Sequence, residues 1–240
     1  MLRMNYPELA AKPALKSLTT NQERLLTLYT EAVVKANDLL HLTSERDKPF
    51  FRQRHVDDAI ALLQHLPEAI TATSSAKVLD VGTGNGIPGL ILAILCPQWQ
   101  VDLLDSSNKK CLFLDTFINN NAINNARVYC TRAEELARTG HRESYNFVFC
   151  RALEKLPTAL ELTIPFAKVG GLVIVSHGTS WNEEHQRSQN ALKLLESELE
   201  TSIPYSIEGK TDLVTLLIRK KAPTLPRYPR NVGIPTKRPL

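Results

Sequence analysis

The sequence predicts an α/β fold built on a mostly parallel sheet, and three observations support this. Residues 77–95 read as a short apolar strand, a glycine-rich turn and a helix. Apolar strands then alternate with helical segments as far as residue 175, the pattern of parallel strands joined by crossover helices. The apolar runs 203–207 and 213–218 are separated by a short polar link, which requires antiparallel pairing. We therefore expect a seven-stranded, mostly parallel sheet with an antiparallel strand.

A helical extension is predicted before the first strand. Residues 1–18 carry two prolines and little periodicity, and we expect a loose arm or a short helix there. Thr20 and Glu23 match a capping box, and apolar residues recur at helical spacing over 25–40. The next helix, from about residue 49, carries charged residues that form either a solvated face or the mouth of a site. These are Arg52, Arg54, His55, Asp57 and Asp58.

The strand 77–81 leads into a turn that contains Gly82, Gly84, Gly86 and, at its end, Gly89. Glycine permits positive φ and lets a ligand approach bare backbone. The helix that follows, from about residue 88 to 95, has a proline in its first turn, where the missing N–H costs nothing. A strand, a glycine turn and a helix N-terminus together predict a site for a nucleotide-shaped ligand. The alternative is a purely structural turn.

Two carboxylates indicate which ligand this is. The strand 101–104 ends in Asp105, which can accept both hydroxyls of a ribose. Asp80, beside the glycine turn, would repel a pyrophosphate. It could instead hold the α-amino end of S-adenosylmethionine, directly or through the turn. The pair therefore favours S-adenosylmethionine over a nicotinamide cofactor.

Further candidates follow the next strands. Lys109 and Lys110 lie in the first turn of the helix 108–118, where the helix dipole disfavours cations, so an anion is expected nearby. Residues 131–135 follow the strand 127–130 and are placed to meet an adenine ring. Arg151 ends the strand 145–150, and ligands bind outside the carboxyl ends of such strands. The alternative is that Arg151 pairs with a surface acid.

The C-terminal half completes the predicted sheet. We expect a helix over 156–166, a helix stop and turn at 169–171, and a strand over 172–175. A long amphipathic helix is predicted over 182–200, before the antiparallel pair. Five parallel strands followed by such a pair suit a methyltransferase-type sheet better than a two-lobed dinucleotide fold.

The last residues, 219–240, contain seven basic side chains, five prolines and no acid. Such a segment cannot form a packed core of its own. It is either a solubilising tail or an electrostatic arm for phosphates, in which Tyr228 stacks on a base.

Composition sets the remaining limits. The 240 residues are 43% hydrophobic and 22% charged, which fits one large domain or a domain with a small appendage. The net charge of +4 allows nucleic acid as a partner. The four cysteines form no C-x-x-C pair, so we expect reduced thiols and no metal site. We also expect no signal peptide and no membrane span, and hence a cytoplasmic protein.

These motifs resemble those of a known family, the bacterial RsmG (GidB) ribosomal RNA methyltransferases, over about residues 20–240. The closest match is Asp80-Val81-Gly82-Thr83-Gly84-Asn85-Gly86-Ile87-Pro88-Gly89, which is similar to D-[VL]-G-[TS]-G-x-G-[FIL]-P-G. Shorter matches are His41 to Asp47 (N-L-T-x-x-R-D), Arg54 to Asp58 (R-H-[IV]-L-D), Arg132 to Glu135 (R-[AV]-E-E), Arg151-Ala152 (S-R-A), and the tail from Tyr228 to Gly233 with Lys237 to Leu240. The sequence departs from the family pattern at Asp57, Ala59, Asn108, Cys150 and His177.

The resemblance implies a class I S-adenosylmethionine-dependent methyltransferase, a Rossmann-like domain over residues 71–221. The extension would span 1–70 and the basic, proline-rich tail 222–240. By position, it implies that Gly82, Ile87, Asp105, Ala133, Glu134 and Arg151 contact or border the cofactor, and the turn itself adds Asp80, Gly84 and Gly86. It implies that Lys109, Arg132 and Arg151 serve RNA or catalysis.

The implied reaction forms 7-methylguanosine in small-subunit ribosomal RNA. Nitrogen 7 of guanine has a free lone pair and no proton, so it needs no general base. This agrees with a sequence in which we find no nucleophile, triad or metal cluster. We expect a monomer. The alternatives are a small-molecule or protein methyltransferase, a non-catalytic RNA-binding relative and, third, a nicotinamide dehydrogenase.

Overall fold

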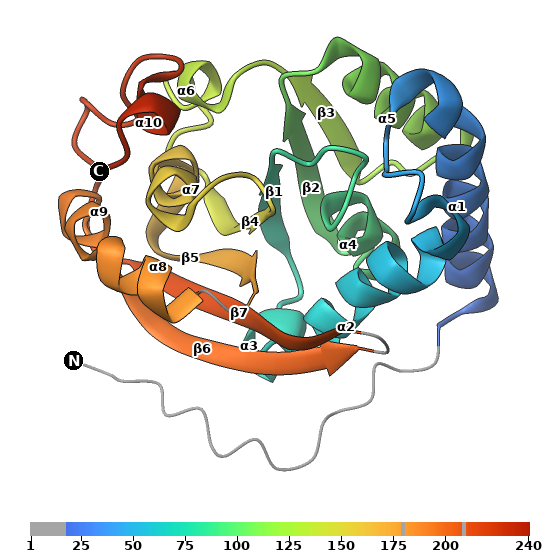
Figure 1. Cartoon of the computed structure of the whole chain (residues 1–240), viewed down its shortest axis with the longest axis horizontal. Coiled ribbons are helices and arrows are strands. Elements are labelled where there is room, and N and C mark those ends of the chain that lie inside the picture. Colours follow the sequence, from blue (N-terminus) through green and yellow to red (C-terminus); the bar gives the residue numbers. More distant parts are fainter. Residues whose placement is uncertain (1–17, 179–180, 208–209) are drawn as a thin grey trace.

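The computed structural model describes residues 18–178, 181–207 and 210–240, and it contains one seven-stranded sheet (Figure 1). The strand order is β3-β2-β1-β4-β5-β7-β6, and β7 runs antiparallel to both of its neighbours. The remaining neighbours pair in parallel. The predicted mixed sheet with an antiparallel strand is therefore confirmed. The expected arm over residues 1–17 lies outside the described residues.

The elements alternate along the chain as the sequence predicts. The strands are β1 (Ala76–Val81), β2 (Trp99–Asp105), β3 (Ala126–Cys130), β4 (Tyr145–Arg151), β5 (Ala167–His177), β6 (Ser197–Ile207) and β7 (Lys210–Lys220). The helices are α1 (Thr20–Leu40), α2 (Asp57–His65), α3 (Glu68–Thr71), α4 (Gly89–Leu95), α5 (Asn108–Asn120), α6 (Ala133–Leu136), α7 (Leu156–Thr163), α8 (Trp181–Arg187), α9 (Gln189–Leu194) and α10 (Ile234–Lys237). Short 3₁₀ or π segments cover Lys48–Phe50, Arg52–Val56 and Ile164–Phe166.

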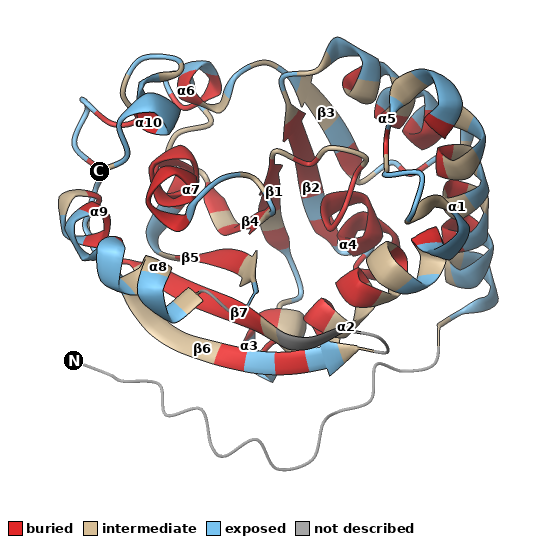
Figure 2. Ribbon diagram, in the orientation of Figure 1, coloured by how far each residue is buried: buried red, intermediate tan, exposed pale blue. Residues whose placement is uncertain are grey.

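Two apolar layers hold the sheet, one on each face (Figure 2). Successive residues of a strand point to opposite faces. Accordingly, Val78 of β1 packs with α1, α2, α4 and α5, whereas Leu79 packs with α7 and α9. Both residues are fully buried. This explains why the central strands read as continuous apolar runs, as parallel strands covered on both faces do.

The first helix begins one residue earlier than its predicted capping box. The cap is Thr19, whose Oγ1 accepts a hydrogen bond from the Gln22 amide at 3.2 Å. The Gln22 Oε1 in turn accepts from the Thr19 amide at 3.0 Å. Thr20 and Glu23 have the same spacing, so the pattern could not distinguish the two. Gln22 also donates to the carbonyls of Ile94 and Leu95, and this tertiary contact favours the observed register.

Two predictions in the C-terminal half were wrong. The expected turn at 169–171 lies inside β5, where an irregular register opposite Tyr145 and Phe147 accommodates the two glycines. The expected helix over 182–200 is instead α8 and α9, and β6 begins at Ser197. Leu199 and its neighbours pair with β7, which satisfies the backbone groups that the two strands turn toward each other. Sheet pairing here outweighs the helical periodicity.

The C-terminal segment folds back onto the domain (Figure 1). Arg142 donates to the carbonyls of Thr224 and Tyr228 at 2.6 and 2.7 Å. Arg230 forms an ion pair with Glu161 at 2.6 Å. The Tyr228 ring is buried in the apolar layer beside α7 and α9, at 5% exposure. The proposal that Tyr228 stacks on a base is therefore wrong, because its ring is already part of the core.

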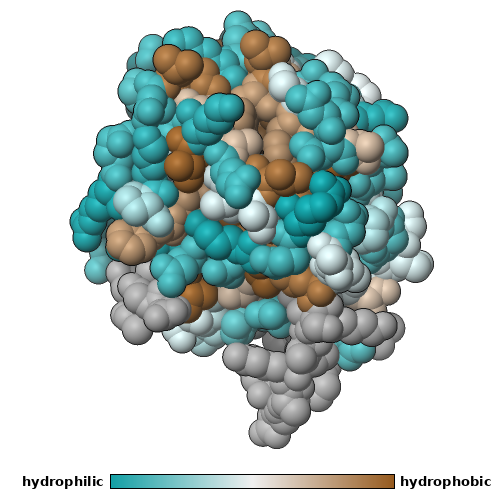
Figure 3. All heavy atoms as spheres, turned by 90° about the vertical axis from the view of Figure 1, so that its right-hand side faces the viewer, coloured by the Kyte–Doolittle hydropathy of each residue, from teal (hydrophilic) through white to brown (hydrophobic). Residues whose placement is uncertain are grey.

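The face around α1 and α5 is mainly hydrophilic, with separate hydrophobic patches (Figure 3). Within the described ranges, no helix combines the length and apolarity that a membrane crossing requires. In the same residues, no three His, Cys, Asp or Glu side chains are grouped as metal ligands would be. All four cysteines are free thiols, and only Cys130 is exposed.

Candidate active site

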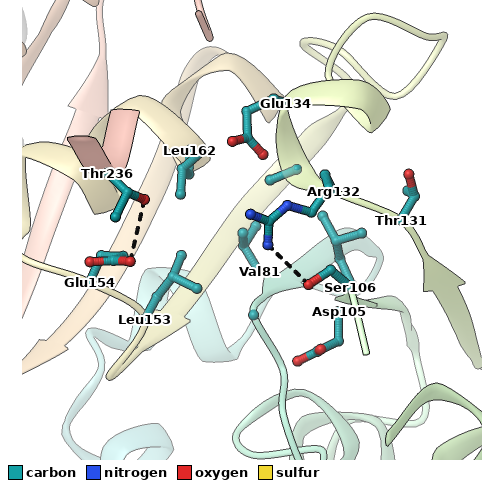
Figure 4. Close-up of a pocket in the computed structure, with 13 residues that line it drawn as sticks. Val81, Asp105, Ser106, Thr131, Arg132, Glu134, Leu153, Glu154, Leu162 and Thr236 are labelled. Carbon is teal, nitrogen blue, oxygen red and sulfur yellow. Dashed lines mark hydrogen bonds between the residues drawn. The ribbon is translucent and has the colours of Figure 1, made fainter. Parts of the chain in front are cut away.

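A cavity of about 130 Å³ lies at the carboxyl ends of β1, β2 and β3 (Figure 4). This is the edge where open α/β sheets bind ligands. The chain closes the cavity with the loop after β4 and with the C-terminal segment. Its lining consists of Val81, Gly82, Leu104, Asp105, Ser106, Thr131, Arg132, Ala133, Glu134, Leu153, Glu154, Leu162 and Thr236.

The glycine turn forms one wall of this cavity. Gly82, Gly84 and Gly86 have φ values of 71°, 60° and 109°, a region that favours glycine. A Cβ on Gly82 would lie 2.3 Å from the Leu153 Cδ1 atom, so Leu153 would have to move, and the positive φ of Gly82 would strain any other residue there. The amides of Gly82 and Thr83 donate to the Leu104 carbonyl, which ties the turn to the end of β2. The turn thus presents bare backbone to the cavity.

The N-terminal extension supports the same turn from behind. The Tyr29 hydroxyl of α1 donates to the Asn85 carbonyl at 2.7 Å. The Asn85 side chain donates to the Leu42 carbonyl at 3.1 Å. Both bonds link residues more than forty positions apart in the sequence. Part of the shape of the turn is therefore set by helices outside the strand–turn–helix unit.

Asp80 braces the turn instead of lining the cavity. It is only 1% exposed, and its Oδ2 accepts from the Thr83 hydroxyl at 2.6 Å and from the Gly89 amide at 2.8 Å. Its Oδ1 is buried with no hydrogen-bond partner among the described residues. Burial raises the pKa of Asp80 to about 6. Of the two routes by which Asp80 could act on a ligand, the geometry favours the one through the turn.

Asp105 lines the cavity and is fixed at both oxygens. Its Oδ2 accepts from the Gly84 amide at 2.9 Å, and its Oδ1 accepts from the Ser107 amide at 2.8 Å. Each carboxylate oxygen has a second lone pair. Asp105 can therefore still accept hydrogen bonds from a ligand diol while the backbone holds it in one orientation.

The start of α6 forms the opposite wall. Arg132 reaches across toward β2 and donates to the Ser106 hydroxyl at 3.2 Å (Figure 4). Ala133 also lines this wall. Glu134 is 5% exposed and accepts from the Gly233 amide of the C-terminal segment at 2.9 Å. Glu134 thus joins the cavity wall to the tail.

Arg151 lies outside the lining of this cavity and faces the N-terminal helices. It forms an ion pair with the buried Asp58 at 3.3 Å and donates to the His55 Nδ1 at 2.9 Å. A guanidinium can only donate, so Nδ1 of His55 is the acceptor nitrogen. Asp58 also accepts from the Tyr205 hydroxyl of β6 at 3.1 Å. The predicted charged cluster therefore holds Arg151, and its other members pair within the extension.

The cavity brings together five of the sequence-predicted residues: Gly82, Asp105, Arg132, Ala133 and Glu134. Asp80, Gly84, Gly86 and Ile87 shape or support the turn behind it. Lys109 is exposed in the first turn of α5. Sequence reasoning missed Leu153, Glu154, Leu162, Thr236 and Tyr205, and no local motif marks them.

The charge of the lining favours a cationic ligand. Three carboxylates, Asp105, Glu134 and Glu154, line the cavity with one guanidinium, Arg132. These carboxylates disfavour an anionic ligand such as the pyrophosphate of a dinucleotide and suit the positively charged sulfonium. The bare backbone of Gly82 and the fixed acceptor Asp105 also suit a nucleoside. The residues present therefore fit S-adenosylmethionine.

Comparison with known proteins supports this interpretation. A family model described as "GidB: rRNA small subunit methyltransferase G" matches residues 22–214. A protein named "Ribosomal RNA small subunit methyltransferase G" from Syntrophomonas wolfei is 34% identical, over 88% of this chain and 97% of its own length. Its namesake from Streptococcus sanguinis SK36 is 32% identical over the full length of both chains.

Among solved structures, the chain is similar in fold to M. jannaschii TYW2 in complex with AdoMet, with a TM-score of 0.53 and 13% identity over 68% of this chain and 73% of that one. It is also similar to cofactor-bound Rv0187 from MTB, with a TM-score of 0.55 and 17% identity over 83% and 91%. At these identities the likeness concerns the fold alone. The family model covers most of the chain, and the curated relatives exceed 30% identity over nearly all of it. This chain therefore belongs to the GidB family, rRNA small subunit methyltransferase G.

Proposed function

We propose that this protein binds S-adenosylmethionine in the cavity at the carboxyl ends of β1 to β3 and methylates nitrogen 7 of a guanine in small-subunit ribosomal RNA. The observation that carries the proposal is Asp105, a fixed carboxylate beside the bare backbone of Gly82. Family membership and the names of the relatives support the ribosomal RNA substrate.

The cofactor would be held mainly by the glycine turn, by Asp105 and by the start of α6. Asp105 accepts from the ribose hydroxyls, and Ala133 and Glu134 border the ligand. Asp80 acts through the turn, because Thr83 and Gly89 bind its carboxylate. When bound, S-adenosylmethionine supplies an electrophilic methyl group on a positively charged sulfur.

The chain needs no base for this chemistry, since nitrogen 7 already carries a free lone pair. Its residues contribute by fixing the guanine against the methyl group and by excluding water. Such alignment can lower a barrier by about 7–11 kcal/mol in favourable cases. This agrees with a lining that contains the bare backbone of Gly82 and the fixed carboxylate of Asp105.

Basic side chains around the site would hold the RNA. Arg132 lines the cavity, Lys109 is exposed on α5, and Arg151 is fixed by Asp58. They suit a phosphate or the carbonyl oxygen of guanine. They must not bind nitrogen 7, as an arginine fork does when it reads guanine in DNA. We therefore expect the target base to be splayed out of its stack.

The proposed assembly state is a monomer, and the proposed location is the cytoplasm. One chain supplies every wall of the cavity, so the site does not need a second copy. A small-molecule or protein methyltransferase would use the same cofactor residues but would leave ribosomal RNA unmodified. A non-catalytic relative would bind RNA without the cofactor.

Calorimetric titration with S-adenosylmethionine, with NAD as the control ligand, tests the cofactor. We expect binding of the first alone, and its loss in Asp105→Ala. Asp115→Ala, which removes an exposed carboxylate from α5, is the matched control and should bind normally. Small-subunit RNA treated with enzyme and cofactor should then gain one 7-methylguanosine, detected by mass spectrometry. Cofactor binding without RNA methylation would overturn the proposed substrate.

A further inference from the structure

A second, larger cavity lies at the opposite edge of the sheet. Its volume is about 570 Å³, and it lies at the amino ends of β1 to β5. On β1, its lining residues Ala76 and Lys77 start the strand, whereas Val81 and Gly82, which line the first cavity, lie at the other end. Its lining is almost entirely polar and consists of Ser75, Ala76, Lys77, Gln100, Asp102, Arg127, Tyr129, Asn146 and Lys168.

This cavity exists because one face of the sheet is incompletely covered. The crossover between β3 and β4 contains the single four-residue helix α6, which is about 6 Å long. That helix covers the upper part of this face, where Leu79 and Leu104 are buried. Below it, on the same face, Lys77 is the register partner of Gln100, and Asp102 that of Arg127. Polar side chains stand where a parallel sheet normally carries buried apolar ones.

Cationic side chains predominate in this cavity. Lys77, Arg127 and Lys168 line it, with Asp102 as the only carboxylate of the lining. Arg127 and Lys168 are exposed. The ammonium of Lys77 lies 4.5 Å from the centre of the Tyr145 ring, which holds this side chain across the sheet.

The one carboxylate of the lining is buried and already bound. Asp102 is 5% exposed, and its Oδ2 accepts from the Tyr145 hydroxyl at 2.8 Å. Burial raises the pKa of Asp102. The exposed charge of the cavity is therefore positive, and a ligand at its mouth meets Arg127 and Lys168 first.

We propose that this cavity is a second RNA-contact site, which binds backbone phosphates of the ribosomal RNA away from the target guanine. The proposal rests on the proposed function, because it assigns another part of the same substrate. Lysine and arginine side chains at phosphates fix the register of a protein on a nucleic acid, whereas contacts with base edges carry the sequence information. The site would therefore orient the RNA, while the cavity at the carboxyl ends selects the base.

The test is the double variant Arg127→Gln/Lys168→Gln, because both side chains are exposed and their loss leaves the core intact. Fluorescence anisotropy would measure the affinity for a labelled small-subunit RNA fragment across salt concentrations. We expect weaker binding, with the slope of log K against log[salt] reduced by about one for each lost contact. The KM for RNA should rise, while kcat and the affinity for S-adenosylmethionine stay unchanged.

Lys35→Gln/Lys193→Gln is the matched control, since it removes the same charge from exposed positions on α1 and α9. An equal loss in this control would mean that only the net charge matters, and would overturn the proposal. An unchanged slope and KM in the cavity variant would do the same. If the cavity variant bound protein-free RNA normally and bound only assembled subunits more weakly, the partner of the cavity would be a ribosomal protein and the proposal would be wrong. Wild-type protein that fails to methylate RNA would contradict the proposed function itself.

Discussion

Asp80 is a nearly inaccessible carboxylate, and its surroundings make stability depend on pH. Its pKa is raised by burial from an ordinary 3.8 to about 6 in the folded protein. Below about pH 4 the group is protonated in both folded and unfolded chains, so its contribution to stability is fully present. As the pH rises toward and through 6, the unfolded chain loses this proton first. Stability should fall across that window by up to about 3 kcal/mol.

Urea unfolding of the wild type and of Asp80→Asn between pH 4 and 7.5 would measure this effect. Asparagine keeps an acceptor for Thr83 and Gly89 but cannot ionise. We expect the free energy of unfolding of the wild type to fall, relative to the variant, as the pH rises. Asp115→Asn, at an exposed position, should show no such divergence from the wild type. If the free energies of unfolding of the wild type and of Asp80→Asn changed in parallel with pH, the raised pKa of Asp80 would be contradicted.

Arg151 depends on two residues that the sequence did not single out as a pair. Asp58 binds its guanidinium, and Tyr205 fixes Asp58 from the far strand β6. We expect Asp58→Asn to lower kcat by about a hundredfold, because a displacement of the Arg151 guanidinium by about 1 Å can have an effect of this size. The affinity for S-adenosylmethionine should stay unchanged. Tyr205→Phe should have a smaller effect in the same direction.

Single-turnover methylation and calorimetry on the same preparations would separate these effects. Asp57→Asn is the matched control, since Asp57 is adjacent but pairs with Arg52. Breaking a buried ion pair is strongly destabilising, by about 3–5 kcal/mol, so melting curves must accompany the kinetics. If Asp57→Asn lowered kcat by the same amount, the proposed role of Asp58 in positioning Arg151 would be contradicted.

Among the elements, the C-terminal segment differs most from its expected behaviour. Its composition indicates a segment without a core, yet Tyr228 packs beside α7 and Thr236 lines the candidate site. Glu161 of α7 is completely buried. Its carboxylate accepts hydrogen bonds from both the guanidinium and the backbone amide of Arg230. Part of the positive charge of the segment, at Arg230, therefore compensates a buried acid of the domain.

The ion pair between Glu161 and Arg230 should therefore be important for stability. Arg230→Met leaves a buried carboxylate without its cation, and we expect a loss of about 3–5 kcal/mol in the free energy of unfolding. Lys221→Met breaks the exposed pair with Glu198 and should cost no more than about 1 kcal/mol. Chemical denaturation of both variants at pH 7 compares them directly. Similar losses would show that burial does not distinguish the two pairs.

At the level of the whole molecule, the N-terminal helices and the sheet share one core. Leu26 of α1 and Leu62 of α2 belong to the same apolar layer as Val78 of β1 and Ile91 of α4. Tyr29 also binds the glycine turn at Asn85. The extension is thus structurally part of the candidate site, although the domain boundaries at residues 70 and 221 remain predictions.

We therefore expect the protein to unfold in one cooperative transition. Scanning calorimetry should give equal calorimetric and van't Hoff enthalpies. S-adenosylmethionine at a hundred times its Kd should shift the whole transition, with a stabilisation of about 2.7 kcal/mol. Two separate transitions, of which the ligand shifts only one, would show that the extension folds independently.

Some features of this fold are determined by short stretches of the sequence. The strand–glycine–helix unit, the position of Asp105 and the parallel direction of the first five strands follow from apolar periodicity and turn chemistry within short windows. The break between α9 and β6 cannot be predicted in this way, because residues 182–200 have helical periodicity throughout. Only the pairing with β7 makes the residues from Ser197 onward a strand.

The sequence by itself determined the α/β class, the glycine turn with its two carboxylates, and the family resemblance. Each of these depends on residues close together in the chain. Only the tertiary structure decided that Arg151 binds Asp58 and Tyr205, that Glu161 binds Arg230, and which tail residue lines the cavity. Asp58 and Tyr205 are 147 positions apart. Periodicity states which side chains are buried, but the partner of a buried charge is set by how distant segments pack.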